Sequence, residues 1–248
     1  MAKARAVVLA AGQGTRMKSD LPKVLVPVRG RPMIDYVLDM LEQCAVEQTI
    51  VVVGYRSELV REHLAGRKNI AFAEQHERLG TGHAVMMCRD ALAGFDGATA
   101  VVCGDSPLVR AESINSLLRE RERGDAACLL GTANKDNPFG LGRIVRDAAG
   151  RFVGIVEEKD ATPEQRKITE VNMSCYVFRN ADLLGSLDKL RADNAQREYY
   201  ITDCPGILRA AGRPVEALAV LTPQETLSIN TAEELAVVEQ AMAHSPNS

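Results

Sequence analysis

The residues best suited to chemistry lie near the N-terminus, in the segment LAAGQGTRMKSDLPK (9–23). An apolar run leads into a loop that contains Gly12 and Gly14, and Arg16 and Lys23 follow. Glycines let backbone N–H groups come close to an anion, and basic side chains supply the positive charge that phosphate groups require. The segment therefore predicts a phosphate-binding loop that would suit a nucleoside triphosphate.

Neither of the two best-known phosphate-binding motifs fits this loop. Both G-x-G-x-x-G and G-x-x-x-x-G-K-[ST] require a glycine at position 17, where the chain has Met17. A surface turn with solvated basic residues explains the composition of the loop equally well. On the residue types alone, both interpretations stay open.

The composition is that of an ordinary globular protein. The chain has 248 residues, of which 46% are hydrophobic and 25% are charged, so it can bury a sizeable core. A net charge of -3 disfavours nucleic acid as the principal partner. No apolar run approaches the roughly 20 residues of a membrane span or the core of a signal peptide. We expect a cytoplasmic protein without a nucleic-acid or membrane partner.

The six cysteines indicate core packing and not metal binding. They form no C-x-x-C pair and have no histidines nearby at ligand spacing, so a zinc site is not expected. Several fall within apolar runs, where a free thiol packs as a small hydrophobic group. The six are Cys44, Cys88, Cys103, Cys128, Cys175 and Cys204.

In the first half of the chain, short β-branched runs alternate with segments of helical length. The runs are RAVVLA (5–10), TIVVVG (49–54), NIAFA (69–73) and ATAVVCGD (98–105). Such alternation predicts βαβ units and a Rossmann-like α/β fold with a mostly parallel sheet flanked by helices. Ligands bind beyond the carboxyl ends of such strands. We therefore expect the Gly12 loop and the GDSP turn (104–107) to face one crevice.

The pattern changes after about residue 135. The segments GLGRIVRD (140–147) and RFVGIVEE (151–158) predict a hairpin, and EVNMSCYVF (170–178) predicts a further strand. Consecutive strands without helices between them indicate antiparallel additions to the sheet, which would shape a substrate pocket. The segment LSINTAEELAVVEQAMA (227–243) predicts a C-terminal helix with Asn230 or Thr231 as its N-cap.

The N-terminal segment resembles the L-A-A-G-x-G-T-R-M-x-S-x-x-P-K motif of the sugar-phosphate nucleotidyltransferases. Within that superfamily, the chain most resembles the pyrophosphorylase half of bifunctional N-acetylglucosamine-1-phosphate uridyltransferases. Further matching segments follow in the same order: AEQHERLGTGHA (73–84), GDSPL (104–108), GLGRIV (140–145), GIVEEKDAT (154–162), EVNMS (170–174) and NAQREYYITD (194–203). The resemblance covers almost the whole chain and favours the phosphate-binding interpretation of the loop.

The resemblance implies an enzyme that joins UTP and N-acetylglucosamine 1-phosphate into UDP-N-acetylglucosamine and pyrophosphate, with Mg²⁺ as cofactor. It implies one domain over 1–243, with a nucleotide-binding half (1–134), a mainly sugar-binding half (135–229) and a C-terminal helix (230–243). Residues 244–248 would form a tail. The chain has no hexapeptide repeat, so we do not expect the β-helical acetyltransferase of the bifunctional proteins.

The resemblance also implies a role for individual residues. Catalysis would depend on Arg16, Lys23 and Asp105. The nucleotide would contact Leu9, Ala10, Ala11, Gly12, Gly14, Thr15, Gln75, Gly80 and Thr81, with the Gln75 amide facing the imide edge of uracil. The sugar would contact Gly104, Gly142, Glu157, Asn172, Glu198 and Tyr199. Asp105 and Asn230 would provide oxygen ligands for Mg²⁺. His83 is given no chemical role.

Two departures from the family pattern lie beside the sugar-binding positions. The family usually has N-T-G where this chain has Asn172, Met173 and Ser174, and Q-G-E-Y-Y where it has Gln196, Arg197 and Glu198. A serine or arginine in place of glycine adds bulk and predicts a different backbone conformation, which leaves the acceptor sugar open. The alternatives are a nucleotidyltransferase for another sugar or base and a non-catalytic nucleotide-sugar sensor.

Overall fold

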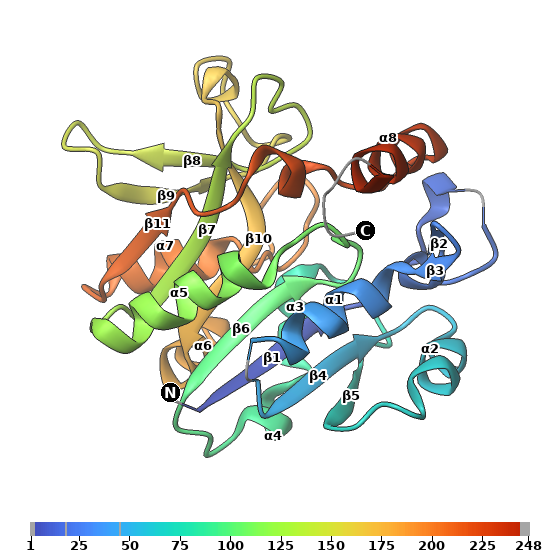
Figure 1. Ribbon diagram of the computed structural model, residues 1–248. Coiled ribbons are helices and arrows are strands. Elements are labelled where there is room, and N and C mark those ends of the chain that lie inside the picture. The colour runs from blue at the N-terminus through green and yellow to red at the C-terminus, as the bar shows by residue number, and fades with distance from the viewer. Residues whose placement is uncertain (1–2, 18, 45, 244–248) are drawn as a thin grey trace.

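A nine-stranded mixed sheet runs through the centre of the computed structural model, which describes residues 3–17, 19–44 and 46–243 (Figure 1). Its main strands follow the order β11-β7-β10-β6-β1-β4-β5. Their bounds are β1 (Ala4–Leu9), β4 (Gln48–Val53), β5 (Ile70–Glu74), β6 (Ala98–Cys103), β7 (Cys128–Asn134), β10 (Glu170–Arg179) and β11 (Val215–Leu218). The strands β6, β1, β4 and β5 pair in parallel, so the predicted parallel α/β sheet is confirmed.

The second half of the chain adds antiparallel strands, as its pattern predicts. Strand β10 pairs antiparallel with both β6 and β7, and it therefore joins the two halves of the chain in one sheet. Strands β8 (Arg143–Arg146) and β9 (Phe152–Val156) form the expected hairpin, which attaches to β10 where Val171 pairs with Arg143. The hairpin projects beyond the main sheet (Figure 1).

Helices cover both faces of the sheet. One face packs against α1 (Met33–Glu42), α2 (Ser57–Leu64) and α5 (Ala111–Arg123). The other packs against α3 (Thr81–Met86), α4 (Arg89–Leu92), α6 (Asn180–Leu187) and α7 (Asp203–Ala210). In β1, Ala6 and Val8 join the first hydrophobic cluster and Val7 joins the second, because successive side chains of a strand point to opposite faces. Burial on both faces fixes the position of the loop that follows β1.

The C-terminal helix α8 (Ala232–Ala243) packs near the beginning of the chain. Its Val238 and Met242 are buried with Val28 of the small ribbon formed by β2 (Pro27–Val28) and β3 (Arg31–Pro32). Figure 1 shows α8 beside this ribbon, so residues more than 200 positions apart in sequence meet there. The packing carries Asn230, which precedes α8, to the N-terminal loop. Within the described ranges, no helix has the length and apolar character to cross a bilayer.

Candidate active site

The predicted phosphate-binding loop leaves β1 as an open turn. Ala10 and Ala11 continue the strand and are buried, whereas Gly12, Thr15 and Arg16 are exposed. Gly14 has a φ of 68°, and its carbonyl accepts a hydrogen bond from the Met17 N–H at 2.8 Å. A Cβ atom at Gly14 would lie 2.8 Å from the Cβ of Lys23. Glycine is therefore needed here both for its conformation and for close packing against Lys23.

Lys23 joins the two predicted metal ligands. It lies in the short helix η2 (Lys23–Leu25), and its side chain is 14% exposed. Its Nζ lies 2.5 Å from Oδ2 of Asp105 and 2.9 Å from Oδ1 of Asn230. Asp105 comes from the carboxyl end of β6, next to the end of β1 in the parallel sheet. The fold therefore assembles one ionic cluster, which we call the Lys23 cluster, from three distant parts of the sequence.

The two oxygens of the Lys23 cluster have the chemistry of a magnesium site. A carboxylate and an amide oxygen are hard donors, and both point at one cationic nitrogen in this structure. Mg²⁺ takes few protein ligands and completes its shell with phosphate oxygens and water. In the part of the chain that the structure describes, no three His, Cys, Asp or Glu side chains gather as a metal site. The predicted pair thus fits a metal that is shared with a bound phosphate.

The side chain of Asn230 serves the Lys23 cluster, while its backbone N–H donates to the Glu234 carboxylate of α8 at 2.6 Å. Its Oδ1 also accepts a hydrogen bond from Nη2 of Arg16 at 3.1 Å, and its Nδ2 donates to Ser228. The hydroxyl of Thr231 accepts the hydrogen bond from the Glu234 N–H at 3.2 Å. Of the two residues predicted as the N-cap of α8, Thr231 therefore has the cap, because the Asn230 side chain is directed to Arg16 and Lys23.

The residues predicted to bind uracil form a second group. Gln75 follows β5 and is 5% exposed, and its Nε2 donates to the Gly80 carbonyl at 3.0 Å. The same Nε2 lies 3.1 Å from Nδ1 of His83 in α3. These contacts fix the amide plane and leave Oε1 of Gln75 as the acceptor side. His83, for which the sequence predicts no chemical role, is thus a supporting residue for Gln75.

Gly80 connects the predicted nucleotide and sugar positions. It has a φ of 106°, and a Cβ atom there would lie 2.5 Å from the Tyr199 carbonyl oxygen and 2.9 Å from the Cβ of Glu198. The Tyr199 N–H donates to the Leu79 carbonyl at 2.8 Å. The Thr81 hydroxyl accepts a hydrogen bond from the Ile201 N–H at 3.1 Å. The loop before α3 and the segment before α7 therefore pack together as one wall of the candidate active site.

Three of the predicted sugar-binding residues lie side by side. The Asn172 N–H donates to the Gly142 carbonyl at 2.8 Å. A Cβ atom at Gly142 would lie 3.4 Å from Oε1 of Glu157 and 3.6 Å from the Cβ of Asn172. Burial raises the pKa of Glu157, and a hydrogen bond from Thr202 acts in the opposite direction. The Asn172 side chain is held within the protein, because its Nδ2 donates to the Tyr176 hydroxyl at 2.7 Å and its Oδ1 accepts a hydrogen bond from the Ser174 N–H at 3.3 Å. The arrangement therefore offers the Glu157 carboxylate and the second lone pair of the Asn172 Oδ1 to the hydroxyl groups of a sugar.

Both departures from the family pattern have a backbone conformation that glycine favours. Ser174 has a φ of 52° and Arg197 a φ of 56°, so each has the left-handed conformation that non-glycine residues rarely adopt. Ser174 lies in an irregularity of β10, where the pairing with β7 shifts between Asn172 and Cys175. A serine and an arginine side chain at these positions therefore impose backbone strain, and whether the backbone differs from that of the glycine-containing relatives stays a prediction.

Cys103 and Gly104 lie between the residues of the predicted phosphate site and those of the predicted sugar site. Gly104 is buried, and its N–H donates to the Leu9 carbonyl at 2.9 Å. Burial raises the pKa of Cys103 to about 12, with Asp105 acting in the same direction and a hydrogen bond to Ser174 acting against it. The negative charge of Glu157 also acts on this thiol. Cys103 is therefore protonated at neutral pH and links the two groups in space.

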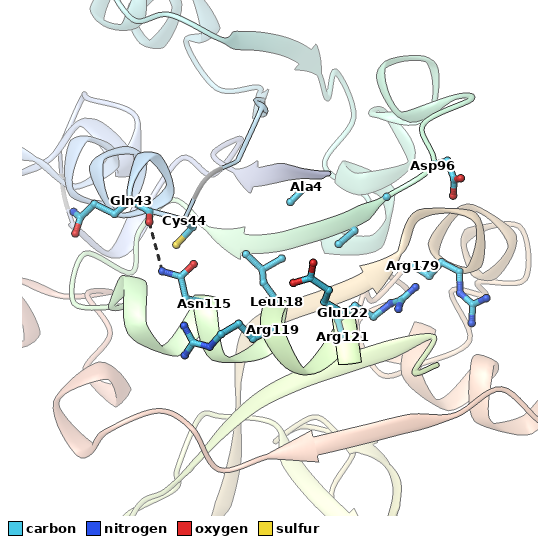
Figure 2. Close-up of a pocket in the computed structure, with 12 residues that line it drawn as sticks. Ala4, Gln43, Cys44, Asp96, Asn115, Leu118, Arg119, Arg121, Glu122 and Arg179 are labelled. Atoms are coloured by element: carbon cyan, nitrogen blue, oxygen red, sulfur yellow. Dashed lines mark hydrogen bonds between the residues drawn. The ribbon is translucent and has the colours of Figure 1, made fainter. Parts of the chain in front are cut away.

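One cavity of the protein lies away from these residues. It has a volume of about 520 Å³ and opens at the amino ends of β1 and β6, beside Ala4 and Ala98. Figure 2 shows Cys44 and Asn115 at one end and Arg179 at the other. The Gly12 turn and Asp105 follow the carboxyl ends of the same two strands. This cavity thus lies at the amino ends of the strands, and the candidate phosphate site lies at their carboxyl ends.

Comparisons with known proteins identify the family of the chain. The family described as "MobA-like NTP transferase domain" matches residues 6–201. The chain is 44% identical over 236 residues to the "Bifunctional protein GlmU" of Geotalea daltonii, covering 95% of this chain and 52% of that protein. It is 43% identical over 242 residues to the same-named protein of Listeria innocua, covering 98% and 52%.

The chain thus spans about half the length of the curated relatives that it matches. Its fold is similar to that of a putative glucose-1-phosphate thymidylyltransferase from Bacillus anthracis, with a TM-score of 0.80 at 18% identity over 98% of this chain and 96% of that one. The loop after β1, the Lys23 cluster and the extent of the family match lead to one conclusion. The chain belongs to the MobA-like NTP transferase domain family and is a nucleotidyltransferase.

Proposed function

We propose that this protein transfers the uridylyl group of UTP to N-acetylglucosamine 1-phosphate and releases pyrophosphate. The observation that carries the proposal is the convergence of Asp105 and Asn230 on Nζ of Lys23, beside the glycine turn after β1. The sequence resemblance supplies the choice of uridine and of the sugar. The 43–44% identity to proteins named GlmU supports that choice.

The chain's own residues suit an in-line displacement without a protein nucleophile. An oxygen of the sugar 1-phosphate attacks the α-phosphorus of UTP, the α–β phosphoanhydride bond breaks, and pyrophosphate leaves with the electron pair. Such chemistry depends on positioning and on neutralising phosphate charge. The turn at Gly12 and Gly14 offers backbone N–H groups, and Arg16 and Lys23 offer positive charge. Bound Mg²⁺ would add further neutralisation of the phosphate oxygens.

Lys23 has to change partners when the nucleotide binds. In this structure its ammonium group is the counter-ion of Asp105 and lies between the two metal-ligand oxygens. An α-phosphate near the turn would attract the ammonium group away from Asp105 and Asn230. The same movement frees both oxygens for Mg²⁺. We therefore propose that Lys23 neutralises the metal ligands in the free enzyme and the α-phosphate in the complex.

The acceptor sugar would bind between the β8–β9 hairpin and β10. Glu157 and Asn172 lie on either side of Gly142. The Glu157 carboxylate and the second lone pair of the Asn172 Oδ1, which already accepts from the Ser174 N–H, would accept hydrogen bonds from the sugar hydroxyls, and the Gly142 backbone would face the N-acetyl group. Gln75, with its amide held by Gly80 and His83, would read the uracil edge from the opposite wall. The two substrates would then meet at Cys103 and Asp105.

A matrix of nucleotides against sugar 1-phosphates tests the proposal. Purified protein with Mg²⁺ is given UTP, dTTP, CTP, ATP or GTP with N-acetylglucosamine, glucosamine, glucose or galactose 1-phosphate, and pyrophosphate release is measured. We expect the highest kcat/KM with UTP and N-acetylglucosamine 1-phosphate. No pyrophosphate release with any pair would overturn the proposal. Tight binding of a UDP-sugar without pyrophosphate exchange would instead identify a nucleotide-sugar sensor.

A different acceptor sugar is the second candidate, because the two strained residues lie at the sugar side. Ser174 and Arg197 replace glycines of the family pattern next to Asn172 and Glu198. The same matrix decides the question, since a changed acceptor would retain the preference for UTP and shift the best sugar. The intact Lys23 cluster favours both catalytic candidates over a sensor, which has no need for metal ligands.

A further inference from the structure

The structure contains a buried cation beside the proposed sugar site to which neither the motif nor the mechanism gives a role. Arg143, the first residue of β8, is the largest fully buried side chain among the described residues, and its side chain is 2% exposed. Its Nε has no hydrogen-bond partner in the described ranges. A buried ion pair with an unsatisfied donor contributes little net stability. The position therefore calls for an explanation other than stability.

Arg143 holds the turn that contains Gly142. One terminal nitrogen donates to the Leu141 carbonyl, and Nη2 donates to Oε2 of Glu158 at 2.6 Å. The same Oε2 accepts a hydrogen bond from the Gly140 N–H at 3.1 Å. The guanidinium and the carboxylate thus fasten two consecutive residues of the turn to the end of β9. The geometry of the turn depends on this ion pair.

Arg143 and Glu158 are each adjacent in sequence to a residue that is predicted to bind the sugar. Gly142 precedes Arg143, and Glu157 precedes Glu158. Gly142 is in turn bonded through its carbonyl to the Asn172 N–H at 2.8 Å. A displacement of the turn would therefore move the Gly142 backbone relative to both Glu157 and Asn172.

Arg143 also opposes the negative charge that surrounds Glu157. Burial, Asp203 and Asp160 raise the pKa of Glu157, whereas the hydrogen bond from Thr202 and the charge of Arg143 lower it. The other titratable groups that interact with Glu157 are neutral near pH 7: Cys103, Tyr176 and Tyr200. Without Arg143, Glu157 would face two carboxylates and no compensating cation among these groups.

We propose that Arg143, paired with Glu158, is a positioning residue for the acceptor sugar, fixing the 140–142 turn and presenting a positive charge to Glu157. The inference rests on the proposed function, because it concerns the same sugar site. Arg143 itself is too deeply buried to reach the substrate and acts through Gly142 and Glu157. Its loss should therefore affect the sugar substrate and leave the nucleotide unaffected.

The test compares Arg143→Met and Glu158→Gln with Arg143→Lys as the conservative variant. We expect Arg143→Met to raise the KM for the sugar 1-phosphate roughly 10- to 100-fold, with the KM for UTP unchanged within about twofold. Glu158→Gln should show a smaller rise, and Arg143→Lys should recover part of the loss. Arg146→Met is the control, because Arg146 lies in the same strand as Arg143 but makes its ion pair with Glu170 of β10, at 2.7 Å. It should leave both KM values unchanged.

A pH profile separates positioning from a general loss of structure. Since Arg143 lowers the pKa of Glu157, its removal raises that pKa. The acid limb of kcat/KM for the sugar should then move to higher pH in Arg143→Met and move back in Arg143→Lys. An unchanged acid limb, or equal effects on the KM of both substrates, would overturn the inference. Thermal unfolding checks the fold, and if Arg143→Met does not fold, Glu158→Gln decides the question.

Binding measurements keep this test independent of turnover. If the wild-type protein binds sugar phosphates in calorimetry but releases no pyrophosphate, the uridylyl-transfer proposal fails. The Arg143 inference is then decided by whether Arg143→Met and Glu158→Gln weaken that binding and Arg146→Met does not. If the wild-type protein binds no sugar phosphate at all, both the proposed function and the inference are wrong.

Discussion

The phosphate end and the sugar end of the candidate site are built by different means. At the phosphate end, charged and amide side chains from residues 16, 23, 105 and 230 converge on one point. At the sugar end, backbone hydrogen bonds and unusual backbone conformations hold Gly142, Asn172 and Ser174 in place. At the phosphate end, the residue types alone determine the charges that come together. At the sugar end, the backbone conformation depends on the packing of the whole surrounding loop. Substitutions at the two ends should therefore have different consequences.

The strongest prediction concerns Asp105 at the phosphate end. Asp105→Ala removes a carboxylate from the Lys23 cluster and should lower turnover by at least about 10²- to 10³-fold. The fold should persist, because Asp105 is partly exposed and is not part of the core. Pyrophosphate release over a Mg²⁺ titration measures the effect, with the exposed Asp90→Ala as control. Substantial activity at saturating Mg²⁺ would contradict the role given to Asp105.

Lys23→Ala should separate rate from metal affinity. Turnover should fall by about 10²-fold, because the α-phosphate loses its cation. Mg²⁺ binding to the nucleotide-free protein should become tighter, since the ammonium no longer occupies the space between Asp105 and Asn230. Titration calorimetry without UTP measures this affinity. Unchanged or weaker Mg²⁺ binding would show that Lys23 does not compete with the metal.

Gly80→Ala tests the wall that joins the two ends. The new Cβ would lie 2.5 Å from the Tyr199 carbonyl oxygen, so we expect a loss of about 1 to 3 kcal/mol in the free energy of unfolding. Gly150→Ala is the control for a positive φ without a close contact, because Gly150 has a φ of 77° and a methyl group there would meet no atom within 4 Å. Gly80, with a φ of 106° and a ψ of 176°, also has a backbone conformation that only glycine readily adopts. Gly150→Ala should cost only the backbone strain of about 1 kcal/mol. Denaturant unfolding that gave equal losses for both variants would show that the contact with Tyr199 is unimportant.

The smallest effects are expected from restoring glycine at the sugar end. Ser174→Gly and Arg197→Gly should each relieve left-handed strain and raise the free energy of unfolding by about 0.5 to 1 kcal/mol. Their KM for UTP should not change, whereas the preference among sugar 1-phosphates should. Asn69→Gly, at another left-handed position, serves as the control for strain alone. A change in the KM for UTP would show that the two ends are less separate than the structure indicates.

The fold can be predicted well from the sequence, because hydrophobic runs alternate with helical segments over the first 134 residues. The parallel strands, the hairpin over 140–158 and the C-terminal helix all agree with the pattern. The segment of helical length between β5 and β6 forms two short helices, α3 and α4. Local pattern does not reveal such an interruption, since both pieces bury the same apolar face.

The motif positions predict that the charged residues of the phosphate end lie close together. They do not predict which of these residues contact one another. That Lys23 binds both Asp105 and Asn230 depends on the packing of α8 against β2, which no local pattern reveals. The supporting roles of His83 and Arg143 are likewise absent from the sequence pattern. A histidine eight residues after Gln75 and an arginine directly after Gly142 acquire meaning only when the loops are placed in three dimensions.

A structure of the protein with UTP and Mg²⁺ would show whether Lys23 leaves the metal ligands for the α-phosphate. We predict that the triphosphate lies on the turn at Gly12 and Gly14, with Mg²⁺ on Asp105 and Asn230. Nζ of Lys23 should have left Asp105, 2.5 Å away in the free protein, for the α-phosphate. A nucleotide bound elsewhere, with that turn empty and the Lys23 cluster unchanged, would contradict the claim.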